Sequence, residues 1–447
     1  MGSGGASGLG WIVAGARPLH FSLIGGVFPW AVVAVAVVAL TATVVWPEPG
    51  WPWRLLRLGL FSGAAMAVVA IAVARLRVFD FTYPRSFYVW VGLVVFAAGV
   101  ARAGWPAFGW RRRAMSLLAV LATVAMAGTL VNLHYGYYPT PAAVLGQLAA
   151  HEVSPRHLFQ QAAGALPSPA HGGEVVTVDI PATVSGFPHR PSLVYLPPAW
   201  FDRPRPALPV ILMLSGTPGL TSDWTRAGGA DRTADAYAAT HSGWAPILVL
   251  ADSNGSDTGD TECVDGRRGK AETYLTVDVP AYVVKAFGAP PARWGVAGLS
   301  EGGTCAIMLA LRHPTTFGTF ADFAGDFTPT LGSKEATVRG LYGGSQAQWK
   351  AHDPLTLLSR TQYHDLAGWF EVGTADSRPL AAAIGLEAAS RAAGITTKLI
   401  ERPGLHHNFL FWSSALQDAF PWMADRLSSS APSRKDSTIT PPTASAQ

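Results

Sequence analysis

Long uncharged hydrophobic runs fill the first third of the chain, whereas short hydrophobic segments separated by polar ones fill the rest. Each long run has about 15 to 19 residues, close to the length of a helix that crosses a hydrocarbon core of roughly 30 Å. Tryptophans stand near most ends of these runs, where membrane interfaces favour them. The pattern predicts a membrane region in residues 1–136 with four transmembrane helices, at about 28–46, 58–74, 87–101 and 114–131.

Arginine placement indicates how these helices are oriented. The third loop between the runs carries Arg102 and three consecutive arginines at 111–113, and basic loops favour the cytoplasmic side. The chain after residue 136 then lies outside the cytoplasm. The second loop is also basic and goes against this orientation. No ionisable residue lies inside a run, so an anchor is favoured over an ion pathway.

Composition supports the membrane assignment and argues against nucleic-acid binding. Charged residues make up 14% of the chain, against about 25% in a typical soluble protein. The formal net charge is +4, but the first 136 residues contain ten arginines and only two acidic residues. The basic excess therefore belongs to the membrane region, and we expect the bilayer as a partner and no nucleic acid.

The remaining two thirds predict an α/β domain. Residues 137–172 are rich in proline and form a connector with one short helix at about 142–151. From residue 173, strand-like runs alternate with helical stretches, which indicates a mostly parallel sheet with helices on both faces, over residues 173–427. Residues 428–447 are rich in Ser, Thr, Pro and Ala and predict a disordered tail. The expected strands are 175–180, 192–195, 210–214, 247–251, 294–297, 317–323, 368–372 and 397–401, and the expected helices are 277–287, 303–312, 381–393 and 409–427.

The sharpest motif is Gly298-Leu299-Ser300-Glu301-Gly302-Gly303. It follows an expected strand and opens an expected helix, the setting of a nucleophile elbow, in which a serine occupies a tight strand-to-helix turn. Glycines on both sides remove side chains that would collide with the crossing backbone. Ser300 is therefore the candidate nucleophile of an enzyme.

A serine nucleophile needs a histidine base and an acid that orients it, in the chain order Ser, acid, His for such sheets. Asp376 follows the expected strand 368–372, and His406 and His407 follow the strand 397–401. The pattern favours Asp376 as the acid and leaves the two histidines open. Three rival acids stand on other loops: Asp326, Asp353 and Asp365.

The segment His407-Asn408-Phe409-Leu410-Phe411-Trp412 resembles the one that opens the last helix in the esterase D family, which includes the antigen 85 mycolyltransferases. Three further segments, at 212–219, 298–303 and 373–376, extend the resemblance over about 181–427. It implies an α/β-hydrolase fold with His407 as the base, and Trp412 becomes a candidate substrate contact. Glu301 and an aspartate acid depart from the mycolyltransferase pattern, which favours hydrolysis over transfer to trehalose.

An oxyanion hole is expected beside Ser300. The segment Ser215-Gly216-Thr217 follows the strand 210–214, where such folds place the loop that carries one donor. The backbone N–H groups of Thr217 and Glu301 are therefore the candidate donors. A plain Gly/Pro turn is the alternative interpretation of the segment.

The two cysteines, Cys263 and Cys305, are candidates for a disulfide, because the domain is expected outside the cytoplasm. Two reduced thiols are the alternative. No Cys/His spacing indicates a metal, and the loop 252–260 lacks the glycine and glutamate positions of a calcium loop. We expect neither a metal nor a cofactor.

The expected function is that of a membrane-anchored serine esterase outside the cytoplasm, acting on a lipid or another ester of the cell envelope. The acidic loop 252–260 and Glu301 suggest attraction of a protonated amine, as in an aminoacylated lipid. An internal salt bridge of Glu301 with Arg267 or Arg268 is the competing interpretation. The alternative functions are an acyltransferase of the mycolyl type and an inactive adhesion or scaffold domain.

Overall fold

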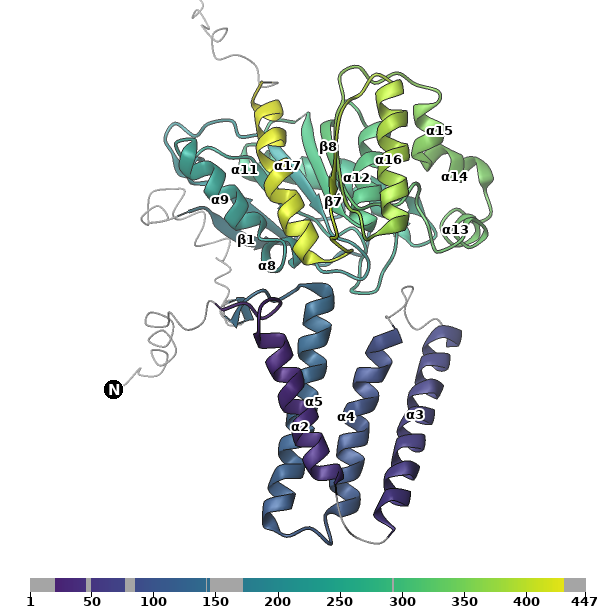
Figure 1. Ribbon diagram of the computed structural model, residues 1–447. Helices are drawn as coiled ribbons and strands as arrows, with labels where there is room; N and C mark the ends of the chain where they lie inside the picture. The colour runs from purple at the N-terminus through teal and green to yellow at the C-terminus, as the bar shows by residue number, and fades with distance from the viewer. Residues whose placement is uncertain are drawn as a thin grey trace, which may run out of the picture.

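The computed structural model describes residues 21–45, 50–76, 85–141, 143–144, 172–291 and 293–429. A bundle of helices forms one part, and an α/β domain rests on one end of it (Figure 1). Nearly all of the connector helix and of the tail expected from the sequence lies outside the described residues.

Each hydrophobic run of the first third lies largely within one helix of the bundle. Helices α3, α4 and α5 are long and apolar enough to cross a membrane, whereas α2 has 17 residues and a length of about 26 Å. Helix α5 packs against both α2 and α4, and its last turn reaches the α/β domain (Figure 1). The helices are α2 (Phe28–Val44), α3 (Trp51–Leu76), α4 (Arg85–Gly104) and α5 (Trp110–Tyr135).

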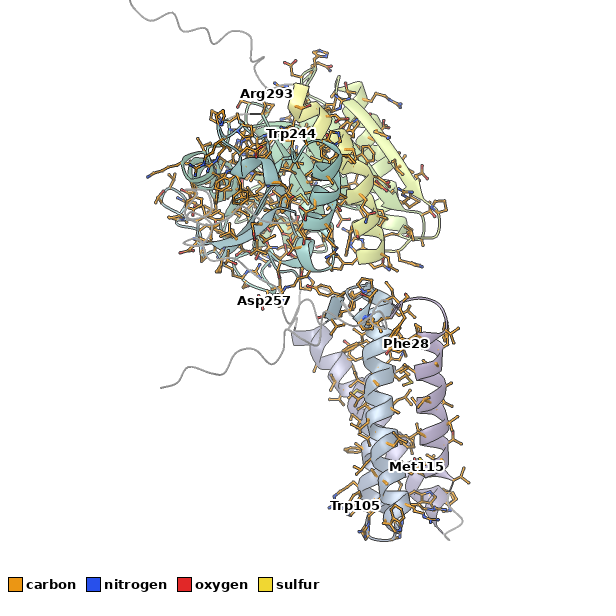
Figure 2. All side chains as sticks on the ribbon, turned by 90° about the vertical axis from the view of Figure 1, so that its left-hand side faces the viewer. Phe28, Trp105, Met115, Trp244, Asp257 and Arg293 are labelled. Carbon is orange, nitrogen blue, oxygen red and sulfur yellow. A yellow bond between two sulfur atoms is a disulfide. The ribbon has the colours of Figure 1, made fainter. Side chains whose placement is uncertain are left out.

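Many large apolar side chains point outward from the bundle, in addition to those in its buried cores. Phe61, Val68 and Leu121 are each more than 60% exposed, and many other valines and leucines of the bundle are exposed as well (Figure 2). Soluble proteins rarely expose contiguous apolar surfaces of this extent. The outward-facing side chains therefore fit a bundle surrounded by lipid.

The α/β domain is built on an eight-stranded sheet in the order β1-β2-β4-β3-β7-β8-β9-β10. Strands β3, β4 and β7 to β10 are parallel, and β1 and β2 join antiparallel at one edge. This topology confirms the α/β fold class. The strands are β1 (Glu174–Val178), β2 (Ser192–Leu196), β3 (Val210–Leu214), β4 (Ile247–Leu250), β7 (Trp294–Leu299), β8 (Phe317–Phe323), β9 (Ala367–Gly373) and β10 (Thr396–Arg402), with a separate pair β5 (Asp265–Gly266) and β6 (Gly269–Lys270).

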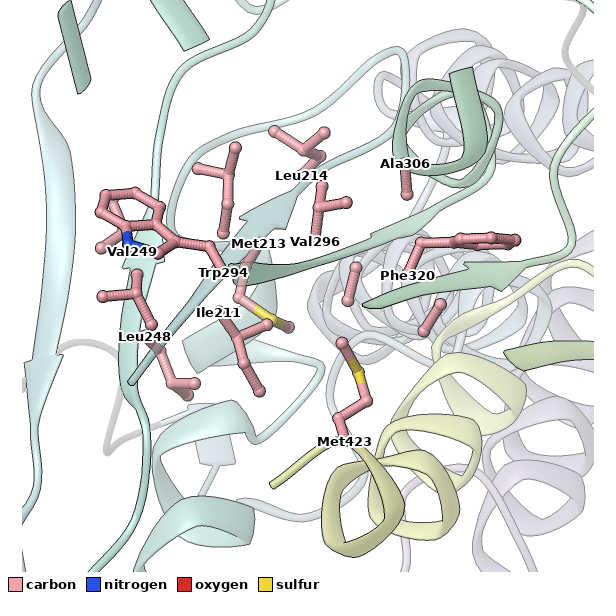
Figure 3. Close-up of a cluster of buried hydrophobic side chains, with 14 of the residues drawn as sticks. Ile211, Met213, Leu214, Leu248, Val249, Trp294, Val296, Ala306, Phe320 and Met423 are labelled. Carbon is pink, nitrogen blue, oxygen red and sulfur yellow. The ribbon is translucent and has the colours of Figure 1, made fainter. Parts of the chain in front are cut away.

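Helices cover both faces of the sheet. Figure 3 shows Ala306 of α12 on one side of the central strands and Met423 of α17 on the other. Residues of β3, β4 and β7 are buried throughout, because both of their faces are covered. The helices are α8 (Asp223–Arg226), α9 (Ala230–Thr240), α10 (Ala271–Thr273), α11 (Val279–Phe287), α12 (Glu301–Arg312), α13 (Lys334–Gly340), α14 (Gln346–His352), α15 (Pro354–Leu358), α16 (Ser377–Ala392) and α17 (Phe409–Ser429), with a 3₁₀ turn η2 (Pro198–Phe201) and a π turn η3 (Tyr274–Asp278).

The carboxyl ends of the parallel strands lie on the side of the domain that faces the bundle (Figure 1). Two loops leave this edge. The oxyanion loop, residues 215–222, joins β3 to α8, and the histidine loop, residues 403–408, joins β10 to α17. Binding sites of open α/β sheets form at this edge, so the fold directs its site toward the helices.

Candidate active site

Ser300 occupies a strained turn between β7 and α12. Its backbone has φ 55° and ψ −123°, which a residue with a side chain rarely adopts. A Cβ atom on Gly298 would collide with the backbone of Gly302, and one on Gly302 would collide with the carbonyl of Leu214. The two glycines are therefore required by the close crossing of the chain, and the turn has the form of a nucleophile elbow.

The structure brings Ser300, His407 and Asp376 into one hydrogen-bonded chain. His407 Nε2 lies 2.8 Å from Ser300 Oγ, and His407 Nδ1 lies 2.5 Å from Asp376 Oδ2. An ionised carboxylate accepts only, so Nδ1 carries the proton and Nε2 is free to accept the serine proton. The geometry selects His407 over His406, which takes no part in this chain of hydrogen bonds.

The rival acids are occupied elsewhere. Asp326 forms an ion pair with Arg378 at 2.8 Å, and Asp353 accepts hydrogen bonds from Thr356 at the start of α15. Asp365 precedes β9, at the edge of the sheet opposite to Ser300. None of the three takes the position of Asp376 beside His407.

The oxyanion loop packs directly against the nucleophile elbow. A Cβ atom on Gly216 would lie 3.0 Å from Ser300 Cβ, so only glycine allows the loop to come this close. The next residue is Thr217, and its hydroxyl donates a hydrogen bond to the carboxylate of Glu301, the residue after the nucleophile. The two candidate donor residues are thus joined to each other beside Ser300.

The side chain of Glu301 is held by hydrogen bonds from three separate segments of the domain. It is buried, and its oxygens accept from the amide of Asn254 at 2.8 Å and from the backbone N–H of Glu262 at 3.0 Å, in addition to Thr217. Of the two arginines considered as partners, Arg268 acts on Glu301 through its charge. Glu301 fastens the elbow to the oxyanion loop, which the sequence could not indicate because its partners lie 39 to 84 residues away.

Burial raises the pKa of Glu301 above its ordinary value, and the hydrogen bonds from Thr217 and Asn254 oppose that shift. Glu262 is also buried, and its pKa is raised by burial and then by the charge of Glu301. Arg268 lowers the pKa of Glu301 by its charge, although its guanidinium donates to the carbonyl of Asp260 at 2.6 Å. Two neighbouring buried carboxyls disfavour a second charge, so one of them holds a proton readily.

Trp412 packs against the base rather than lining an opening. Its side chain is buried, and its ring lies 4.8 Å from the His407 ring and 5.0 Å from the Phe409 ring. These ring contacts hold the imidazole in its orientation, and the substrate contact of Trp412 stays a prediction. The first turn of α17 directs Trp412 inward.

The acidic loop 252–260 is neutralised within the domain. Arg190 forms ion pairs with Asp252 at 2.6 Å and with Asp257 at 2.8 Å, and Arg268 approaches Asp260. The expected negative rim is thus paired with arginine side chains. Two arginines facing three aspartates weaken the electrostatic argument for a protonated amine in the substrate.

Cys263 and Cys305 form a disulfide that ties the loop before β5 to helix α12. Because Glu262 precedes Cys263, the same bridge fixes the backbone N–H that binds Glu301. Over the ranges that the structure describes, no cluster of three or more His, Cys, Asp or Glu residues could hold a metal ion.

The end of helix α5 contacts both loops of the site. The hydroxyl of Tyr137, just after α5, donates to Asp223 Oδ1 at 2.6 Å, at the end of the oxyanion loop. The amide of Asn408 in the histidine loop donates to the carbonyl of His134 at 3.3 Å, and the Tyr137 ring lies 5.1 Å from that of Phe409. The residues just after the last hydrophobic run therefore contact the segments that carry the candidate catalytic residues.

Comparison with known proteins identifies the family. The family model described as "Putative esterase" matches residues 189–423, which include the elbow, Asp376 and the histidine loop. The chain belongs to this esterase family. The resemblance to the esterase D and antigen 85 proteins is thereby confirmed, and the protein is a serine hydrolase or acyltransferase that acts on an ester.

Similar proteins differ in how much of the chain they match. An uncharacterized protein of Corynebacterium glutamicum is 32% identical over 391 residues, which cover 84% of this chain and 90% of that protein. The MPT51/MPB51 antigen of Mycobacterium bovis is 25% identical over 217 residues, covering 46% of this chain and 62% of the antigen. The solved S-formylglutathione hydrolase of Agrobacterium tumefaciens is 22% identical, with a TM-score of 0.49 over 58% of this chain and 97% of the hydrolase.

Proposed function

We propose that the protein is a membrane-anchored serine esterase that cleaves an acyl ester at the outer surface of the membrane. The observation that carries the proposal is the chain of hydrogen bonds from Ser300 through His407 to Asp376, in loops that rest on the end of α5. An esterase needs this chain of hydrogen bonds. A substrate at the membrane surface explains why the loops rest on the end of α5.

The geometry supports a two-step reaction. Ser300 Oγ attacks the ester carbonyl while His407 Nε2 takes its proton, and the imidazolium then protonates the departing alcohol as the C–O bond breaks. Water, activated by the same imidazole, cleaves the acyl-serine and restores the hydroxyl. Asp376 holds the imidazole tautomer throughout. The backbone N–H groups of Thr217 and Glu301 are the proposed oxyanion donors, and such a donor is typically worth roughly 3–4 kcal/mol.

Charge at the far end of the bundle supports an extracytoplasmic domain. Helix α5 separates its first residue, Trp110, from the domain by about 39 Å, and Trp105 lies at this far end in Figure 2. Cytoplasmic ends of spans are enriched in arginine, and the disulfide fits an oxidising compartment. The arginines at or near the far end are Arg54, Arg57, Arg102, Arg111, Arg112 and Arg113.

The proposed substrate is a lipid or another ester of the cell envelope. Because Arg190 pairs with two of the aspartates of the nearby acidic loop, the attraction of that loop for an aminoacylated lipid is reduced, and a neutral ester is the first substrate to test. An acyltransferase of the mycolyl type remains the second candidate, favoured by the similarity to the MPT51 antigens. It differs only in that a hydroxyl replaces water in the second step.

A fluorophosphonate probe tests the proposal on the full chain in membranes. We expect wild-type protein to be labelled and Ser300→Ala not to be, with Ser222→Ala, an exchange in the oxyanion loop, as the matched serine control. Labelling that survives Ser300→Ala removes the nucleophile, and a wild type that never labels supports the scaffold function. Incubation with diacylglycerol, a neutral lipid ester, and with alanyl-phosphatidylglycerol, each with and without glycerol or trehalose, then separates hydrolysis from transfer and ranks the substrates.

A further inference from the structure

A groove of about 560 Å³ lies between helix α5 and the oxyanion loop. Its α5 wall is formed by Gly128, Val131, Asn132 and Tyr135, which follow one another at helical spacing on one face. Gly128 and Val131 belong to the end of the hydrophobic run 114–131, and Asn132 is the first polar residue after that run. One end of the groove therefore lies at the depth where acyl chains end and head groups begin.

The opposite wall belongs to the oxyanion loop. Pro218, Gly219 and Leu220 line it, and Pro218 directly follows Thr217, the proposed donor beside Ser300. The groove thus ends one residue from the proposed oxyanion donor, although Ser300 and His407 do not line it. The volume falls within the range of about 300–1,000 Å³ that small-molecule sites occupy.

The groove is polar at the end away from the bilayer and is held in shape by hydrogen bonds. Arg226 and Asp257 border that end, where a head group would lie. Asp223 joins the two walls, because it accepts from the Tyr137 hydroxyl at 2.6 Å and from the Leu220 backbone N–H at 2.8 Å. The groove is therefore pre-formed and amphipathic along its length.

From this arrangement we infer that the junction groove binds an acyl chain of a membrane lipid ester and guides its carbonyl from the bilayer to Ser300. The inference rests on the proposed function and adds the substrate class and its route. The occupant is a lipid from the bilayer rather than a dissolved ester, because the apolar wall is part of a membrane-spanning run. That wall lies outside residues 189–423, so the groove is not a property of the matched esterase domain alone.

Photo-crosslinking in vesicles tests the groove directly. The full chain, as Ser300→Ala to prevent turnover, is placed in phosphatidylglycerol vesicles that contain a small fraction of phosphatidylglycerol with a diazirine near the end of one acyl chain. We expect crosslinks on residues 218–220, which lie outside every hydrophobic run and meet acyl chains only through the groove. Crosslinks confined to the outward faces of the bundle overturn the inference.

A pair of variants supplies the kinetic test. Val131→Trp fills the groove, whereas Leu121→Trp places the same ring at an exposed position of α5, about 15 Å farther from the domain. Val131→Trp should lower the ratio of long-chain lipid ester to acetyl ester hydrolysis by tenfold or more, and Leu121→Trp should not change it. Gly128→Leu, a smaller filling of the groove, should lower the same ratio.

The two tests distinguish failure of the groove from failure of the enzyme. A ratio that stays unchanged in both Val131→Trp and Gly128→Leu, with fluorophosphonate still labelling Ser300, refutes the groove and leaves the esterase standing. Loop crosslinks in a protein whose Ser300 never labels show a lipid site and refute the esterase.

Discussion

The hydroxyl of Tyr137 lies 2.6 Å from the carboxylate of Asp223, 86 positions later in the chain. Tyr137 follows the last helix of the bundle, and Asp223 is the first residue of α8, directly after the oxyanion loop, so this hydrogen bond joins the helix bundle to the α/β domain beside that loop. Burial raises the pKa of Asp223, and the hydrogen bonds from Tyr137 and Leu220 oppose this rise, so the charged carboxylate depends on these two donors.

Tyr137→Phe should therefore impair catalysis without unfolding the domain. The ring contact with Phe409 persists, but a buried carboxylate loses a donor, at a cost of about 1.5–3 kcal/mol. Displacement of the oxyanion loop should lower kcat by roughly tenfold, measured with an acetyl ester. Tyr237→Phe removes a similar Tyr–Asp bond, to Asp425 between α9 and α17, and should leave kcat unchanged. Equal activity of both variants would contradict the prediction.

Asp376→Asn should lower kcat by about 10³–10⁴, because an amide no longer fixes Nδ1–H of His407 in the reactive tautomer. Asp326→Asn breaks the ion pair with Arg378 and should cost less than tenfold. Steady-state rates with one short ester distinguish the two acids. The reverse order of effects would transfer the orienting role to Asp326.

Glu301→Gln should lower kcat more than it raises KM, because the side chain positions Thr217 and does not contact substrate. Thr217→Val should have a similar effect, since it breaks the same link from the other side. We expect about tenfold for each, and the double variant should be little worse than either. Multiplied losses in the double variant would mean that the two side chains act separately.

Asp322 predicts a pH dependence of stability. It lies buried in β8, and burial raises its pKa from 3.8 to about 7. The folded state then binds a proton more tightly than the unfolded state, so the free energy of unfolding should fall as pH rises from about 4 to 7. Asp322→Asn should flatten this slope and stabilise the protein above pH 7 by up to about 4 kcal/mol, measured by denaturant unfolding. The exposed Asp202→Asn should leave the slope as it is, and a persistent slope in Asp322→Asn would contradict the assignment.

The local sequence pattern predicted those features of the fold that depend on residues close together in the chain. Strands β3 and β8 begin and end where their apolar runs do, because a buried parallel strand needs continuous hydrophobic residues. The elbow was recognisable because its glycines are required by one tight turn. Helix α9 was missed because its buried face, although at helical spacing, consists mostly of alanines and therefore gives a weak hydrophobic signal.

Contacts between distant segments could not be predicted. Arg190 stands 62 residues before Asp252, and nothing in either segment indicates that an arginine neutralises the acidic loop. The same holds for Glu301 and Thr217, and for Trp412, whose inward direction follows from how α17 packs. The tertiary structure sets which charges pair and which side chains pack together.

The hydrogen bond from Asn408 of the histidine loop to the carbonyl of His134 limits the distance from the membrane at which a substrate can meet His407. On the proposed function, this contact holds the histidine loop at the last turn of α5, and chemistry would be confined to a thin layer just above the leaflet. Turnover then depends on how many ester molecules occupy each unit of membrane area, and dilution of the surrounding fluid leaves it unaltered. Cells would regulate such an enzyme through the make-up of the bilayer rather than through secretion of its substrate.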